Sequence, residues 1–87
     1  MLAAERAVVL SALQRYGAKL GDDDRIVARN GNTLGVRVEV KKSRLRMVAT
    51  NAGGLLASYP ASRIDAGVSA FVEGFWYWQP VQQGERP

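Results

Sequence analysis

The first twenty residues carry large apolar side chains at the spacing of an amphipathic helix. These residues are Leu2, Val9, Leu13, Tyr16 and Leu20. Their successive spacings of seven, four, three and four residues keep them on one face of an α-helix. Gly17 and Gly21, followed by three aspartates, favour a helix end and a solvated connection. The pattern predicts a helix over residues 2–20 that ends around the two glycines.

The hydrophobic period changes to two in the next segment, and this is the period of a strand with one buried face. Four apolar residues alternate with three small or charged ones over Leu34–Val40. The pair Asn30-Gly31 is favoured in tight hairpin turns, because both residues tolerate a positive φ. The sequence therefore predicts an antiparallel hairpin between Arg25–Arg29 and Thr33–Val40.

Two further turns extend this hairpin into a meander. One is predicted at residues 41–43 (Lys-Lys-Ser) and the other at residues 51–54 (Asn-Ala-Gly-Gly). They bound a third strand, Arg44–Thr50, in which Leu45 and Met47 point to one face and the two arginines to the other. Residues Leu55–Tyr59 are expected to form a short fourth strand.

A second helix is predicted after Pro60, which closes the sheet. Ser62 and Asp65 have the spacing of a capping box, with Asp in place of the usual Glu or Gln. A core-facing stripe follows at Ile64, Val68, Phe71, Phe75 and Trp78. Pro80 ends the predicted helix, and residues 81–87 are expected to form a flexible C-terminal tail.

The order of these elements predicts the fold class. A helix, an antiparallel meander of three to four strands and a second helix are typical of a two-layer α+β sandwich with both helices on one sheet face. The chain has 87 residues, the size of one domain. We therefore expect a single α+β domain over residues 1–80, with the other face of the sheet free of helices.

The composition removes most catalytic chemistry. The chain contains no cysteine and no histidine, so it lacks disulfides, thiolate metal ligands and an imidazole base. Its glycines and its run of aspartates lack the spacing of phosphate-binding, dinucleotide-binding or calcium-binding loops. We expect a protein that is not an enzyme and that binds no metal and no cofactor. Charges interrupt the N-terminal apolar segment and no run approaches the roughly 18 residues of a membrane span, which predicts a cytoplasmic protein without membrane contact.

Positive charge is concentrated in the predicted sheet. The whole chain carries a net charge of +4, but residues 25–50 hold seven Lys and Arg against one Glu, a net +6, which leaves −2 elsewhere. The cations expected on or beside the helix-free face are Arg29, Arg37, Lys41, Lys42, Arg44 and Arg46. They predict a surface that binds an acidic macromolecule, either nucleic acid or an acidic protein.

This basic segment has alternative interpretations. Exposed strands commonly carry charge for solubility, and lysines at turns discourage the pairing of sheet edges. The first three predicted strands contain no Phe, Tyr or Trp on which single-stranded bases would stack. A solvated face, an acidic protein and nucleic acid therefore remain as alternatives, the last without the usual aromatic platform.

Aromatic residues mark the predicted second helix. Five of the seven aromatic residues fall within Phe71–Trp78, and four of them are consecutive. Four consecutive positions span about 300° of a helix, so Trp76 and Tyr77 point away from the core stripe. Gly67 and Gly74 on its flank permit the close approach of another backbone. These aromatic side chains are covered either by the rest of the chain or by another molecule. In the second case Gly67, Gly74, Trp76 and Tyr77 form an interface, in a homodimer or in an inhibitor or interaction protein that docks on a larger assembly.

Overall fold

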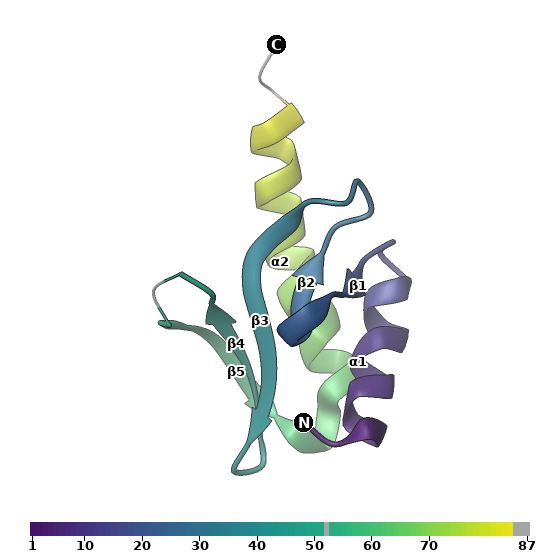
Figure 1. The fold of residues 1–87 in the computed structure, drawn as a ribbon, viewed down its shortest axis with the longest axis vertical. Helices are drawn as coiled ribbons and strands as arrows, with labels where there is room; N and C mark the ends of the chain where they lie inside the picture. Colours follow the sequence, from purple (N-terminus) through teal and green to yellow (C-terminus); the bar gives the residue numbers. More distant parts are fainter. Residues whose placement is uncertain (52, 85–87) are drawn as a thin grey trace.

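A computed structural model describes residues 1–51 and 53–84, with side chains described for residues 1–51 and 53–74. Its elements are α1 (Ala3–Gln14), β1 (Lys19–Leu20), η1 (Asp22–Asp24), β2 (Arg25–Val27), β3 (Thr33–Lys41), β4 (Arg44–Ala49), β5 (Leu55–Pro60), η2 (Ala61–Arg63) and α2 (Ile64–Gly84) (Figure 1). The strands form one antiparallel sheet in the order β1-β2-β3-β4-β5. The predicted α+β fold is confirmed, with five strands in place of three to four.

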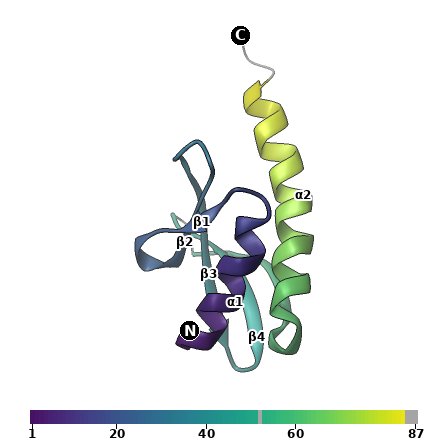
Figure 2. The same cartoon turned by 90° about the vertical axis from the view of Figure 1, so that its right-hand side faces the viewer.

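Both helices pack against the same face of the sheet (Figure 2). Val9 and Leu13 of α1 and Val68 and Val72 of α2 are almost completely buried in the core. The sheet contributes Leu20, Ile26, Val36, Val38, Leu45 and Met47 to the same cluster. The opposite face of the sheet, here called the outer face, carries no α-helix among the described residues; only the short η1 borders it.

The alternation of side chains in β3 and β4 determines the composition of the outer face. Val38 lies opposite Met47 in the sheet register, and both are buried on the helix side. Glu39 lies opposite Arg46 in the next pair, and both point to the outer face because successive strand residues alternate sides. The hydrophobic period in the sequence therefore assigned the two faces of these strands correctly.

The N-terminal helix is shorter than the sequence predicts. Helix α1 ends at Gln14, and Gly17 has a φ of +74°, a left-handed conformation that glycine adopts without steric strain. After this turn Lys19 and Leu20 form β1, which pairs with β2 through Leu20 opposite Ile26. Leu20 does reach the core, but as a strand residue, so the prediction that it ends the helix was wrong.

The second helix continues past the residue at which its end was predicted. Helix α2 runs through Pro80 to Gly84, and its last turns extend beyond the rest of the molecule (Figures 1 and 2). Proline lacks an amide hydrogen and costs roughly 3 kcal/mol inside a helix, which is a local penalty and not an absolute stop. The remainder of the predicted tail, residues 85–87, lies outside the described residues. Within the described chain, no helix is both long and apolar enough to cross a membrane.

Polar contacts between the helices fix the start of α2 against the end of α1. The Arg15 guanidinium donates hydrogen bonds to the Asp65 carboxylate and to the Ser69 hydroxyl. The Tyr16 hydroxyl donates to Glu73 at 2.7 Å, one turn further along α2. Asp65 thus pairs with Arg15, directly after α1, and α2 begins at Ile64 after the short η2 turn, two residues beyond the predicted cap Ser62.

Candidate functional site

The tight turn between β3 and β4 gathers positive charge at one end of the outer face. Lys42 and Ser43 have φ values of 52° and 63°, the backbone of a two-residue turn with positive φ at both central positions. This turn pairs Lys41 directly with Arg44, and the alternation of the strands brings Arg46 to the same face. Consecutive cations in the sequence therefore become neighbours in space.

These cations line an open depression with a volume of about 360 Å³. It is formed by Lys41, Lys42, Arg44, Arg46, Leu55 and Ser58, and we call it the basic depression. Arg44 Nε donates a hydrogen bond of 2.9 Å to Ser58 Oγ, which directs this guanidinium toward β5. Within the described residues, Lys41 and Lys42 make no side-chain hydrogen bond or ion pair. Their charges are therefore available to an external anion.

The centre of the outer face is more balanced in charge. The Glu39 carboxylate lies between two arginines, with Oε2 at 3.3 Å from Arg46 Nε and Oε1 at 3.8 Å from Arg37 Nη1. A carboxylate in this position lowers the positive potential around both guanidinium groups. The net positive charge of the face is consequently concentrated at the β3–β4 turn, beyond Glu39.

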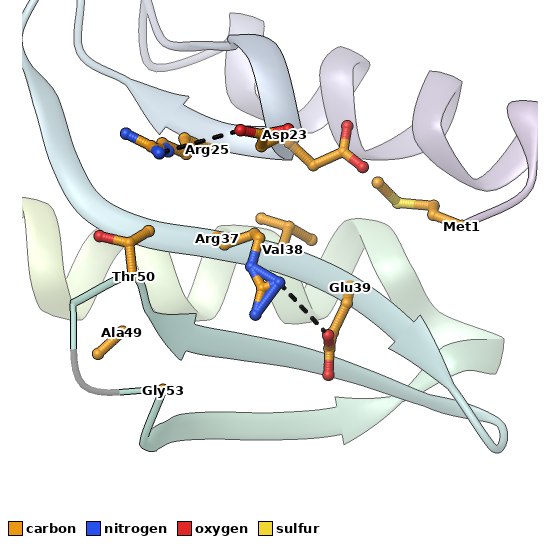
Figure 3. Close-up of a pocket in the computed structure, with 10 residues that line it drawn as sticks. Met1, Asp23, Arg25, Arg37, Val38, Glu39, Ala49, Thr50 and Gly53 are labelled. Carbon is orange, nitrogen blue, oxygen red and sulfur yellow. Dashed lines mark ion pairs between the residues drawn. The ribbon is translucent and has the colours of Figure 1, made fainter.

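A second depression, of about 440 Å³, lies on the outer face toward η1 (Figure 3). Figure 3 shows Arg37 and Glu39 projecting from the same side of β3, while Asp23 and Arg25 approach from η1 and β2. Asp23 and Arg25 form a loose ion pair at 3.9 Å. Within the part of the chain that the structure describes, no group of acidic residues could hold a metal ion. This depression mixes both signs of charge and offers no net attraction for an anion.

Arg29 does not belong to the basic depression. The β2–β3 connection that carries it and the β3–β4 turn lie at opposite ends of the sheet (Figure 1). The nine residues of β3 separate these ends by roughly 26 Å at about 3.3 Å per residue. The Arg29 side chain instead lies against Gly17, where an added Cβ would be 3.0 Å from Arg29 Cδ. The basic depression therefore holds four of the six predicted cations. Arg37 lines the second depression beside Glu39, and Arg29 lies at the far end of β3, because the length of this strand separates the two turns.

Two exposed leucines, Leu55 and Leu56, lie at or next to the basic depression, and the sequence pattern predicted no binding role for them. The exposed fractions of Leu55 and Leu56 are 54% and 49%. A register shift between β4 and β5 lies next to them, between Met47 and Val48. The sequence contains a signal for this exposure: successive strand residues point to opposite faces, so at least one of two adjacent leucines must point away from a one-sided core.

The glycines of α2 have different surroundings. Gly67 is buried against the sheet of its own chain, where an added Cβ would lie 2.9 Å from both Leu45 Cδ2 and Tyr59 Cβ. This contact explains its missing side chain and removes Gly67 from the predicted interface with another molecule. Gly74 is exposed, and an added Cβ there would meet nothing within 4 Å. The side chains of Trp76 and Tyr77 lie outside the described part of the structure.

Shifted pKa values are found at contacts that hold the fold together. The hydrogen bond from Arg15 lowers the pKa of Asp65, and the same contact raises the pKa of Arg15. Burial raises the pKa of the Tyr59 hydroxyl, which lies on the helix side of β5. These shifts do not identify a reactive centre.

Comparisons with known proteins do not indicate a function for this chain. The chain matches no protein-family model, no curated protein and no solved structure. The features that remain are the basic depression, the exposed leucines beside it and the part of α2 that extends beyond the sheet.

Proposed function

We propose that this is a small, non-enzymatic cytoplasmic binding protein that contacts an acidic partner through the basic end of its outer sheet face. The observation that carries the proposal is the convergence of Lys41, Lys42, Arg44 and Arg46 in one open depression. The two lysines have no partner among the described residues. A partner's carboxylates or phosphates would gain attraction there without displacing an existing ion pair of either lysine.

The chemistry beside the cations favours an acidic protein over nucleic acid. Leu55 lines the same depression and is half exposed, so a partner with both apolar and acidic side chains would bury it. The strand residues named on the outer face include no aromatic side chain for base stacking. Glu39 in the centre of the face would also repel a phosphate backbone that crossed the sheet.

Retention on a heparin column tests the proposed function. The double variant Lys41→Glu with Lys42→Glu should elute at much lower salt than the wild type, because it inverts the two unpaired charges. Lys19→Glu with Arg29→Glu is the matched control: it changes the net charge equally, at exposed positions on β1 and on the β2–β3 connection. We expect the control to elute near the wild type. Equal shifts for both double variants would mean that retention reports net charge alone, and the proposal would fail.

The end of α2 supports a second candidate function, in which the protein docks on a larger assembly or forms a homodimer. The last turns of α2 extend beyond the sheet, and the exposed Gly74 leaves space for another backbone at the start of this segment. Light scattering tests this candidate. Trp76→Ala or Tyr77→Ala should reduce the mass of a dimer or complex while the circular dichroism spectrum is retained. A wild-type protein that is monomeric at all concentrations would exclude the homodimer.

A further inference from the structure

Strand β5 is a free edge of the sheet, and it borders the basic depression. It pairs with β4 on one side and with no other strand among the described residues (Figure 1). A free edge presents unpaired backbone N–H and C=O groups, to which another extended chain can add. Leu55 and Ser58 of this strand also line the basic depression.

The sheet register shows which backbone groups of β5 face the open edge. Ala61 N donates to Ser43 O at 3.0 Å, which places Ser43 opposite Ala61 at a hydrogen-bonded position in continuation of the β4–β5 register. Antiparallel pairs alternate between bonded and non-bonded positions, which makes Arg46 opposite Ser58 a non-bonded pair. The amide and carbonyl of Ser58 therefore point away from β4. Pro60 has the same orientation but lacks an N–H, so it limits the ladder at that end.

Side chains of a strand added beside β5 would lie within reach of the cations. Neighbouring strands are about 4.8 Å apart, so an added strand would lie about 10 Å from β4. The Arg44 guanidinium already extends from β4 to Ser58 on β5. A Glu side chain on the added strand could meet it there, and the next outer-face position would occur two residues further along.

We propose that an extended acidic segment of a partner protein adds to β5 as a sixth strand, with Asp or Glu at every second residue facing the basic depression. This inference rests on the proposed function and specifies its partner. Backbone bonds to Ser58 would fix the segment, and contact with Leu55 and Leu56 would bury apolar surface that is now exposed.

Electrostatic repulsion disfavours a second copy of the chain at β5 and leaves the acidic segment as the favoured partner. Two β5 edges that paired with each other would bring two basic depressions together across the joint. In the described part of the chain the lining of the basic depression includes no carboxylate, and Glu39 pairs with only one of its cations, Arg46, so the repulsion from the other three remains. Like-charge contact disfavours self-pairing by the same physics that favours an acidic strand.

The test uses a labelled peptide of about ten residues that alternates Glu with Thr and Val, and measures its affinity by fluorescence anisotropy. Ser58→Pro removes the outward amide without removing a β4–β5 hydrogen bond, and should weaken binding by about tenfold or more. Ser58→Ala is the reference variant: both variants lose the hydroxyl and its hydrogen bond to Arg44, so the additional loss in Ser58→Pro reports the amide alone. The same peptide with its central residue replaced by proline should not bind.

Amide NMR of the wild-type protein provides a second measurement, which does not depend on the folding of the proline variant. The Ser58 amide should become protected from hydrogen exchange when the Glu-containing peptide is added. Equal binding of the proline-containing peptide, or an unprotected Ser58 amide, would overturn the sixth strand and leave the acidic-partner function standing. An oligonucleotide that binds more tightly than the peptide and is insensitive to Ser58→Pro would instead assign the depression to nucleic acid. Concentration-dependent dimerisation that Ser58→Pro abolishes, without peptide binding, would assign the edge to a second copy.

Discussion

Gly67 and Gly74 both lie inside α2, and replacement by alanine should leave the protein less stable at residue 67 than at residue 74. Neither residue has a positive φ, so alanine fits the backbone at both positions. Alanine is favoured over glycine inside a helix by about 1 kcal/mol at each. The two substitutions differ in what the new methyl group meets.

The methyl group at residue 67 would collide with the sheet. Its Cβ would lie 2.9 Å from Leu45 Cδ2, Tyr59 Cβ and Tyr59 Cγ. The Leu45 methyl can rotate, but the Tyr59 Cβ is fixed to the backbone, so α2 must move away from β5. Overpacking of this kind costs about 1–3 kcal/mol, and the gain in helix propensity offsets about 1 kcal/mol of it. At residue 74 an added Cβ meets nothing within 4 Å, so only the gain remains.

The difference between the two variants is the quantity to measure, because the helix-propensity contribution is common to both and cancels. We expect Gly74→Ala to exceed Gly67→Ala in free energy of unfolding by about 1–3 kcal/mol, as measured by urea denaturation. In a domain of this size each kcal/mol corresponds to about 4–8 °C in Tm, so thermal unfolding gives an independent reading. If the two variants have equal stability, the close packing of Gly67 on Tyr59 is not a feature of the folded protein.

Three further substitutions test the core and the shifted pKa values. Leu45→Ala should lower the free energy of unfolding by about 2–5 kcal/mol in urea denaturation, since Leu45 is fully buried between the sheet and α2. The lowered pKa of Asp65 adds stability above about pH 4 that is lost as the pH falls through its folded-state pKa, so Asp65→Asn should reduce the acid dependence of Tm. The raised pKa of Tyr59 affects stability at alkaline pH. Its contribution to the free energy of unfolding is complete below about pH 10 and is lost above it, because the Tyr59 hydroxyl ionises at lower pH in the unfolded chain than in the folded one. Tyr59→Phe should therefore reduce the loss of Tm at alkaline pH.

The sheet could be predicted closely because two independent signals agree there. Alternation assigns the faces of β3 and β4, and the turn residues fix where the strands begin and end. The β3–β4 turn is the clearest case, since Lys42 and Ser43 adopt the positive φ values of a two-residue hairpin. The turn and the strand period together predict that Lys41 lies opposite Arg44 and that Glu39 lies opposite Arg46.

The errors arise where the structure depends on contacts that a local pattern does not contain. Strand β1 has two residues, too few to show a period, and it forms because Leu20 can pair beside Ile26. The position of Arg29 depends on the length of β3, and Gly67 is required by the shape of Tyr59 in a strand that precedes it. The pattern therefore placed Arg37, Arg44 and Arg46 on the correct face of the strands, but it did not show that Arg29 and Arg37 lie apart from the other four cations.

The positive charge beside β5 is expected to repel a second copy of the chain and to attract an acidic strand, and the double variant Lys41→Glu with Lys42→Glu tests both effects. Lysines near an exposed edge keep copies of a protein from pairing, and they also attract an acidic strand. In Lys41→Glu with Lys42→Glu, acidic side chains replace the two unpaired cations, while Arg44 and Arg46 remain. If repulsion protects the edge, this variant should self-associate in light scattering and should also lose the Glu-containing peptide. A variant that stays monomeric but loses the peptide would show that the charge is not needed to protect the edge, which leaves recognition of an acidic partner as its role.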